Sequence, residues 1–571
     1  MLKKIRTVNL KTPFENEKNL TWNEYPRPQL RRESYLSLCG KWELSVKSGE
    51  EETLIGKITV PFPPESRISG IERPLSKNER YVYRKAFSLN TNLGERTILH
   101  FGAADQKAKV FVNNSFVGEH IGGFLPFSFD ITDALIIGEN LIAVEIEDNL
   151  DTDIPYGKQK TKRGGMWYTP ISGIWQPVWL EGVSENYISS LKLTPTLNSI
   201  IIETVGGENE KTVIINTTDG EIKTSFLGNK AEIEIPSPRL WSPEDPYLYN
   251  FKIISGEDTV FSYFALRTIS VGKVNEKAYI LLNGKPYFFH GLLDQGYFSD
   301  GIYTPASPKG FIFDIKTMKK LGFNMLRKHI KIEPDLFYYY CDKYGMIVFQ
   351  DMVNSGKYSF LIDTALPTIG LKKGITHSAS KKRRAQFEAD CKKTIETLYN
   401  HPSVCYYTIF NEGWGQYDAD RIYKELKSLD SSRIWDATSG WFAKKHSDVK
   451  SEHIYFKKIN LKASSRPLVL SEFGGYSLNI PKHCFNLDKV YGYKKFNSSE
   501  ELTKALLKLY RKEIIPAINK GVTAAVLTQV SDVEDETNGL VTYDRQVIKV
   551  DKKAMYELSI ELKEAFSKTI K

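Results

Sequence analysis

The first half of the chain carries short apolar runs typical of β-strands, and no convincing helix lies between them. The clearest runs are residues 97–101, 109–112, 141–146 and 175–180. Residues 109–112 are followed by the turn pair Asn113 and Asn114 and then by a further apolar run, which predicts a hairpin. Short strands at this spacing predict a β-sandwich, which we assign to residues 1–185.

A second β segment covers residues 186–274. Its apolar runs include residues 211–216, 231–235 and 249–254. Its length suits a small immunoglobulin-like sandwich of roughly 100 residues.

The pattern changes after residue 274, where short β runs alternate with amphipathic helices. Residues 311–321 predict a helix, and a second one opens at Pro334 and stops at Gly345. The β runs are residues 287–293, 323–327, 346–350, 404–410, 433–437, 453–456, 468–471 and 522–527. Eight such strands predict a closed (β/α)8 TIM barrel over residues 275–571. An open doubly wound sheet is the alternative, but no GxGxxG motif follows a strand.

Two glutamates directly follow buried apolar strands. Residues 404–410 run into Asn411 and Glu412, and residues 468–471 run into Glu472. A carboxylate in such a place is costly unless it is paired or used, and a barrel places its reacting groups at these strand ends. An isolated Asn-Glu pair would be interpreted as a helix cap or turn. Two glutamates in a barrel instead suggest the paired carboxylates of glycoside hydrolysis.

Several aromatic residues also lie near strand ends, where their faces could stack on sugar rings. They are Trp414, Trp441, Tyr455 and Tyr476. For any single one of them, packing in the core is the competing interpretation.

Composition and charge narrow the choice of partner. A chain of 571 residues predicts about three or four domains. The net charge of +9 is spread along the chain, and its densest run is Lys381, Lys382, Arg383 and Arg384. This run opens a segment with an apolar helical face, so a solvated helix surface is favoured over a nucleic-acid patch. We therefore expect no nucleic-acid partner.

The chain has no run of about 18 apolar residues, so we expect no membrane partner. No apolar stretch follows the N-terminal lysines, and the five cysteines form neither a CxxC nor a Cys/His cluster. These features predict a reduced cytoplasmic protein.

Nine short motifs, in the right order along nearly the whole chain, resemble glycoside hydrolase family 2, the family of β-galactosidases, β-glucuronidases and β-mannosidases. They are LCGKW (38–42), VPFPPES (60–66), SGIWQPVWLE (172–181), LWSPE (240–244), LNGKP (282–286), NMLR (324–327), NHPS (400–403), FNE (410–412) and SEFG (471–474). The resemblance implies a jelly-roll sugar-binding-like domain, an immunoglobulin-like domain and a catalytic barrel.

The resemblance also implies roles for individual residues. Glu412 takes the place of the acid/base, Glu472 that of the nucleophile, and Asn411 that of a ligand to the sugar 2-hydroxyl. The implied mechanism is retaining and needs no cofactor. Arg327 ends the second strand and could orient the nucleophile, with a structural ion pair as the competing interpretation. Further candidates to bind sugar hydroxyls are His329, His453, Asp294 and Asp351, with Gln529 and Asp532 as weaker ones. A structural role for the two histidines, and pairing with an arginine for Asp294 and Asp351, are the alternatives.

Departures from the family pattern bear on the substrate. Residues 349–355 lack the Glu-x-His pair of magnesium-dependent β-galactosidases, so we expect no metal there. The segment around Asn538 lacks the lysine with which β-glucuronidases bind the uronate, which favours a neutral sugar, although Lys328 or Lys331 could enter the pocket. Residues 333–337 and 350–351 are closer to the β-mannosidase pattern, whereas residues 328–331 are not.

We therefore predict a retaining exo-β-glycosidase of β-galactosidase type that acts on a carbohydrate. β-Mannosidase, β-glucuronidase and a non-catalytic carbohydrate-binding protein are the alternatives, and a homo-oligomer stays open. The tryptophans Trp175, Trp179 and Trp241 look like packing elements, so the two β domains are expected to support the barrel or shape its mouth.

Overall fold

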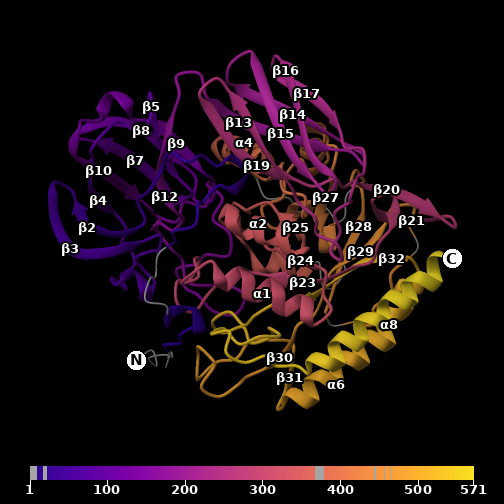
Figure 1. The fold of residues 1–571 in the computed structure, drawn as a ribbon. Coiled ribbons are helices and arrows are strands. Elements are labelled where there is room, and N and C mark those ends of the chain that lie inside the picture. Colours follow the sequence, from indigo (N-terminus) through magenta and orange to yellow (C-terminus); the bar gives the residue numbers. More distant parts are fainter. Residues whose placement is uncertain (1–8, 17–21, 367–378, 443–444, 456, 463) are drawn as a thin grey trace.

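The computed structural model describes residues 9–16, 22–366, 379–442, 445–455, 457–462 and 464–571. Figure 1 shows an N-terminal β-sandwich at the left, a second β-sandwich above, and a barrel with its helices at the centre and right. The predicted fold class, a multidomain β protein with a TIM barrel, is confirmed. All five cysteines are unpaired. Within the described part of the chain, no helix combines the length and the apolar character needed to cross a membrane.

The N-terminal sandwich is built from two antiparallel sheets, in the orders β1-β12-β5-β9 and β3-β2-β4-β10-β7-β8, with a short pair β11-β6. Residues such as Trp42, Val110 and Val144 alternate inward along the strands and fill the core. The predicted hairpin is present, since Val112 pairs with Ser115 across Asn113 and Asn114, both with positive φ. The strands are β1 (Tyr35–Ser37), β2 (Gly40–Ser48), β3 (Glu51–Val60), β4 (Glu79–Leu89), β5 (Arg96–Phe101), β6 (Ala104–Asp105), β7 (Lys107–Val112), β8 (Ser115–Ile121), β9 (Phe127–Asp130), β10 (Gly138–Glu147), β11 (Gly173–Ile174) and β12 (Val178–Val183).

The second sandwich packs a three-stranded sheet, β13-β14-β17, on a four-stranded one, β16-β15-β18-β19. A small sheet, β20-β21-β22, then leads into the barrel. The strands are β13 (Ile188–Pro195), β14 (Ser199–Gly206), β15 (Glu210–Thr217), β16 (Gly220–Leu227), β17 (Lys230–Glu234), β18 (Tyr249–Ser255), β19 (Asp258–Phe264), β20 (Ile269–Val274), β21 (Lys277–Leu282) and β22 (Lys285–Pro286).

The barrel contains eight parallel strands in the order β27-β26-β25-β24-β23-β32-β29-β28. Ser451 on β28 donates a hydrogen bond to Thr438 O on β27 at 3.3 Å, which links the two ends of this order. The strands are β23 (Phe289–Asp294), β24 (Met325–Lys328), β25 (Ile347–Asp351), β26 (Val404–Asn411), β27 (Ile434–Ser439), β28 (Lys450–Ile454), β29 (Leu468–Gly474) and β32 (Val522–Thr528), with a small pair β30 (Tyr476–Leu478) and β31 (Lys494–Phe496).

The helices that surround the barrel bury one apolar face each. They are α1 (Lys309–Lys320), α2 (Asp335–Tyr344), α4 (Lys381–Leu398), α5 (Ala419–Leu429), α6 (Ser499–Leu509), α7 (Ile515–Asn519) and α8 (Lys552–Ile570). Short 3₁₀ or π segments lie at η1 (Pro13–Asn16), η2 (Pro28–Leu30), η3 (Arg67–Ser69), η4 (Thr132–Ala134), η5 (Phe360–Ala365), η6 (Gly440–Phe442) and η7 (Tyr510–Ile514).

The predicted bounds of the sixth strand are wrong. The run 453–456 was expected, but β28 spans Lys450–Ile454, and residue 456 lies outside the described residues. The pattern misled because polar residues such as Lys450 and Glu452 occupy this strand, so its first half carries no apolar signal.

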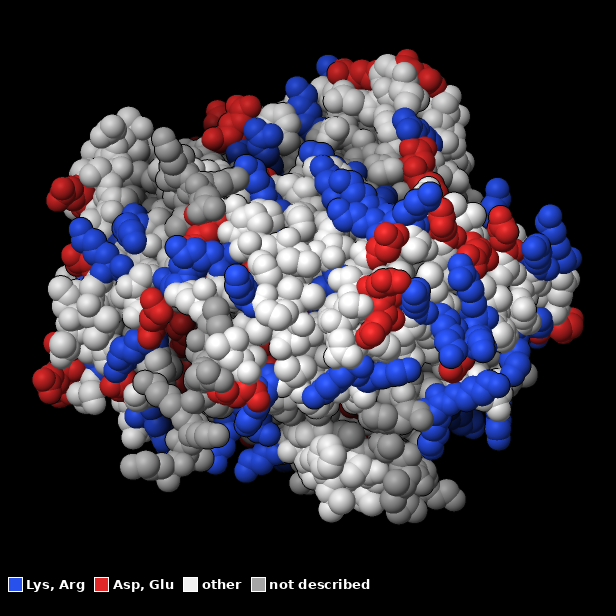
Figure 2. All heavy atoms as spheres, turned by 90° about the horizontal axis from the view of Figure 1, so that it is seen from below, with Lys and Arg blue, Asp and Glu red and all other residues white. Residues whose placement is uncertain are grey.

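The basic run at residues 381–384 opens α4. Lys382 and Arg384 pair with Asp151 and Asp418, as expected of a solvated surface. Arg383 is instead buried and donates to Gly415 O, so this part of the expectation is corrected. Figure 2 shows Lys and Arg spread over the lower face of the molecule, with Asp and Glu between them.

Candidate active site

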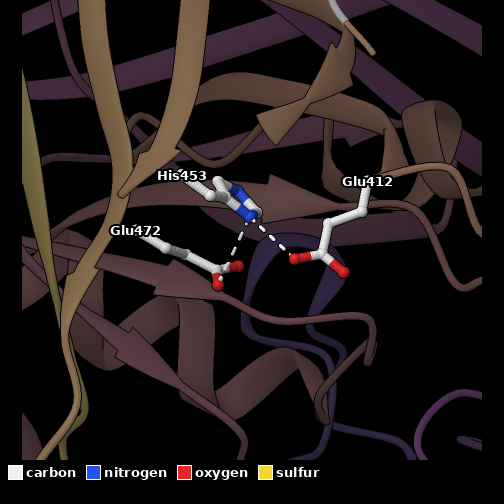
Figure 3. A group of neighbouring side chains, drawn as sticks. All are labelled: Glu412, His453 and Glu472. Atoms are coloured by element: carbon white, nitrogen blue, oxygen red, sulfur yellow. Dashed lines mark hydrogen bonds and ion pairs between the residues drawn. The ribbon is translucent and has the colours of Figure 1, made fainter. Parts of the chain in front are cut away.

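Glu412 and Glu472 face one another across His453 at the carboxyl end of the barrel (Figure 3). Glu412 directly follows β26 and takes a positive φ of 56°, and Glu472 lies on β29. His453 Nδ1 lies 3.0 Å from Glu412 Oε1 and 3.5 Å from Glu472 Oε2. One oxygen of each carboxylate and this nitrogen lie within 4.8 Å of one another. The predicted juxtaposition of the two glutamates is therefore present.

Arg327, at the end of β24, ties the floor of this site together. Its Nη1 donates to Glu472 Oε1 at 2.9 Å, its Nε to Asp351 Oδ1 at 3.0 Å, and its Nη2 to Asn411 Oδ1 at 2.9 Å. Burial disfavours its charge, but Asp351 and Glu472 hold the pKa of Arg327 above its ordinary value. The guanidinium thus links β24 to β25, β26 and β29 through one rigid, fully charged group.

Arg327 also orients His453. Its Nη1 lies 3.3 Å from His453 Nε2, and a guanidinium can only donate hydrogen bonds. Nε2 is therefore the accepting nitrogen in this geometry, and the imidazole proton sits on Nδ1. That proton is directed to Glu412 Oε1 at 3.0 Å, and Glu472 Oε2 lies 3.5 Å from the same nitrogen.

The surroundings of Glu472 favour its anion. Tyr455 Oη donates to Glu472 Oε2 at 2.5 Å and contacts Thr528 Oγ1 at 2.9 Å. Burial alone would raise the pKa of Glu472, but His453, Arg327 and the Tyr455 hydroxyl lower the pKa to about 2. Glu472 is therefore a carboxylate at neutral pH.

Asn411 and Asp351 are held by the same network. Asn411 Oδ1 accepts from Arg327 and also from Ser439 Oγ, at 3.0 Å, so its amide NH₂ group is the end directed to a ligand. Asp351 Oδ2 lies 2.8 Å from His329 Nδ1. Burial raises the pKa of Asp351, but Arg327 and His329 lower it by more than burial raises it. The pKa of Asp351 is therefore below its ordinary value.

The remaining predicted residues lie further out. Trp441 is half-buried and donates to His453 O at 3.3 Å, which places it at the rim. Trp414 is buried, donates to Gly356 O at 2.7 Å and packs on Trp167 with 5.0 Å between ring centroids, so it lies in the wall of the site. Asp294 pairs with Lys328 at 2.6 Å, Asp532 pairs with Lys549 at 2.6 Å, and Gln529 donates to Asn538 at 2.8 Å.

Residues that sequence reasoning missed complete the site. Ser439, on β27, and Thr528, on β32, both lie at strand ends, a position that could have identified them. Tyr493 stands 4.5 Å from the ring of Tyr455, centroid to centroid. Trp167 comes from the N-terminal sandwich, and no local signal in the sequence assigns it to the barrel.

The same three side chains could hold a metal ion. Glu412, His453 and Glu472 are the group of potential ligands that the described part of the chain brings together. Two carboxylates and an imidazole suit a divalent transition metal such as zinc.

Three family models match consecutive parts of the chain. Their descriptions are "Glycosyl hydrolases family 2, sugar binding domain" for residues 19–181, "Glycosyl hydrolases family 2" for residues 187–267, and "Glycosyl hydrolases family 2, TIM barrel domain" for residues 273–567. The chain belongs to glycosyl hydrolases family 2. It is accordingly a glycoside hydrolase, and the predicted family is confirmed.

Individual relatives of this family 2 protein are distant. A β-galactosidase of Thermoanaerobacter pseudethanolicus is 27% identical over 62% of this chain and 47% of its own length. A putative β-glucuronidase of Formosa agariphila is 25% identical over 63% of this chain and 34% of its own length. The match thus spans about half or less of these two curated relatives. A solved β-D-glucuronidase structure of Dictyoglomus thermophilum has a TM-score of 0.75 at 20% identity, covering 95% of this chain and 98% of that one.

Proposed function

We propose that this family 2 enzyme is a retaining β-glycosidase that releases a terminal β-linked sugar through a covalent glycosyl-enzyme. The observation that carries the proposal is the approach of Glu412 and Glu472, whose nearest carboxylate oxygens lie within 4.8 Å. Retaining enzymes hold the two carboxyl groups about 5–5.5 Å apart, whereas inverting enzymes hold them about 6.5–9.5 Å apart to leave room for a water molecule. Single carboxylate oxygens as close as those of Glu412 and Glu472 favour the retaining arrangement.

The different surroundings of the two glutamates support their roles. Glu472 is held as an anion by Arg327 and Tyr455, as a nucleophile requires. The Glu412 side chain is 13% exposed, against 7% for Glu472, and His453 is its described hydrogen-bond partner. It can therefore exchange protons with a leaving group and with water, as an acid/base requires.

The proposed reaction has two steps. In the first, Glu412 gives its proton to the glycosidic oxygen, the bond between this oxygen and the anomeric carbon breaks, and Glu472 forms an ester to that carbon. In the second, Glu412 takes a proton from water, whose oxygen attacks the anomeric carbon and displaces Glu472. Asn411 presents its amide NH₂ group to the sugar 2-hydroxyl.

For the glycone, we propose a β-galactoside-type ring first, with β-mannoside and β-glucuronide as alternatives. The relatives described above include both a β-galactosidase and a putative β-glucuronidase. We include an exo mode in the proposal because the loop between β10 and β11, residues 148–172, hydrogen-bonds to the barrel at Asn354 and Glu534. Domain boundaries near residues 185 and 274, and a supporting role for both β domains, belong to the same proposal.

The stereochemical course of hydrolysis tests the reaction. Proton NMR during turnover of a nitrophenyl β-glycoside should show the β-anomer of the free sugar first, before mutarotation. First release of the α-anomer would mean inversion and would contradict the assigned roles.

A further inference from the structure

The β10–β11 loop brings part of the N-terminal sandwich to the catalytic end of the barrel. Tyr156 N donates to Asn354 O at 3.1 Å, and Thr169 N donates to Glu534 Oε1 at 2.9 Å. Gly157 has a φ of +66°, and a Cβ there would lie 3.0 Å from Ile330 O, so only glycine fits this approach. The loop is therefore seated next to His329, one residue before Ile330.

Lys158, the next residue of this loop, is buried without an anionic partner. The residue is 8% exposed, and its Nζ lies over the Trp167 ring, 5.4 Å from the ring centroid. Within the described chain, no carboxylate lies within ion-pair distance of this ammonium. The side chain has lost much of its contact with water without gaining an ion pair, so an anion from outside the chain would stabilise the ammonium.

The other buried lysines of the described chain show the usual solution. Lys328 pairs with Asp294 at 2.6 Å and Glu333 at 2.8 Å, and Lys331 pairs with Glu333 at 2.9 Å. Lys549 pairs with Asp532 at 2.6 Å, and Lys211 donates to Gly228 O at 3.0 Å. Lys328 and Lys331 are thus already neutralised, and Lys211 donates hydrogen bonds to carbonyl oxygens. Lys158 differs from these lysines because its ammonium, among the described residues, has neither an ion pair nor a hydrogen bond.

Lys158 also lies within electrostatic reach of the site. Trp167, which its ammonium contacts, packs on Trp414, two residues after Glu412. Burial lowers the pKa of His329 to about 4, Asp351 opposes this shift, and Lys158 adds to it. Glu536 lies near Glu472, and burial raises its pKa. Tyr168 and Asn538 donate hydrogen bonds to Glu536, and the positive charge of Lys158 also lowers its pKa.

We propose that Lys158 binds an anionic substituent on the sugar held against Glu472, either the carboxylate of a hexuronic acid or a sulfate ester. The inference rests on the proposed glycosidase function and specifies its substrate class. Lys160, whose Nζ lies 5.2 Å from the centroid of the same Trp167 ring, adds a second positive charge. The expectation of a neutral sugar rested on the cations available near Asn538 and in the strand-two loop. Lys158 is a cation that comes from the N-terminal domain instead.

Matched substrate pairs test the assignment on the full chain. We would measure kcat/KM on nitrophenyl β-galactoside and β-galacturonide, on β-glucoside and β-glucuronide, and on 6-sulfo-β-galactoside, with β-mannoside as a further neutral sugar. For at least one of the galacto- and gluco-configured pairs, kcat/KM on the acidic substrate should exceed kcat/KM on its neutral counterpart about tenfold or more. Preference for the uronide or for the sulfated sugar identifies the source of the anion.

Lys158→Met removes the charge but keeps an apolar stem, and exposed Lys162→Met, in the same loop, is the matched control. A hydrogen bond to a charged group predicts a loss of about 10- to 100-fold on the acidic substrate for Lys158→Met. The neutral substrate and the control should change less than about threefold. Equal losses on acidic and neutral substrates, or neutral sugars preferred throughout by the wild type, would overturn the proposal.

Binding separates this inference from the proposed function. Calorimetry with galacturonate, glucuronate, galactose 6-sulfate and their neutral counterparts needs no turnover. The role of Lys158 is supported if an acidic sugar binds more tightly than its neutral counterpart and this difference is lost in Lys158→Met. That support holds even if no nitrophenyl substrate is cleaved. Absence of cleavage would count against the glycosidase assignment alone. No acid-dependent binding overturns the role of Lys158.

Discussion

Tyr455→Phe removes one hydrogen bond from Glu472 and leaves the ring in place. Tyr455 Oη donates to Glu472 Oε2 at 2.5 Å, and the pKa of Glu472 is lowered to about 2. A hydrogen bond to a charged group contributes about 1.5–3 kcal/mol, and one pKa unit corresponds to about 1.4 kcal/mol. Because the lost donor stabilised the anion, the pKa of Glu472 should rise by about 1–2 units, to about 3–4.

The assay is the pH dependence of inactivation by a 2-fluoro glycoside, which requires ionised Glu472. Each sample is incubated briefly at its pH and returned to pH 7, where an untreated sample shows that the enzyme survived. The acid limb of the variant should lie about 1–2 pH units above that of the wild type, with little change near pH 7, where both are ionised. The control is Tyr81→Phe, which removes a hydroxyl that donates to Arg73 O at 2.6 Å in the N-terminal sandwich. Superimposed profiles for Tyr455→Phe and the wild type would refute the account of Glu472.

Three further predictions concern the acid/base, the arginine and the domains. Glu412→Ala should lose most activity on substrates with poor leaving groups, and azide should rescue aryl glycoside turnover and give a β-glycosyl azide; no rescue and no such product would argue against Glu412. Arg327→Lys keeps the charge but cannot reach Asp351, Glu472 and Asn411 together, so kcat/KM should fall about 100-fold or more with the fold intact by circular dichroism, and a change below threefold would contradict the network. A barrel expressed from residue 275 should be insoluble or much less stable, because it loses the contact of Trp241 Nε1 with Asp342 O at 2.8 Å, whereas a soluble, fully active fragment would show that the β domains are dispensable.

The sequence predicts the barrel well because its strands are buried on both faces. A run such as β26 is buried at every position and mostly apolar until Asn411 and Glu412, so both the strand and its chemistry are visible. The strand β28 is less visible, because Lys450 and Glu452 interrupt the pattern. Local periodicity reports burial, and it fails where a strand carries polar side chains.

The sequence does not predict which distant segments reach the site. Lys158 and Trp167 lie more than 100 residues before the first barrel strand, and contacts such as that of Tyr156 with Asn354 determine where their loop lies. Trp414 looked equally suited to stacking on a sugar, but its indole donates to Gly356 O and is covered by Trp167. These outcomes depend on tertiary packing, about which spacing along the chain carries no information.

The most direct test of the account is to identify the residue that becomes covalently bound to the sugar. The wild-type enzyme is inactivated with a 2-deoxy-2-fluoro β-glycosyl fluoride of the preferred sugar, digested, and mapped by mass spectrometry. The account predicts one fluorosugar per chain, attached to Glu472, and none in Glu472→Gln. A label on Glu412 or on another residue, or time-dependent inactivation that leaves no covalent adduct, would contradict the assignment of Glu472 as the nucleophile.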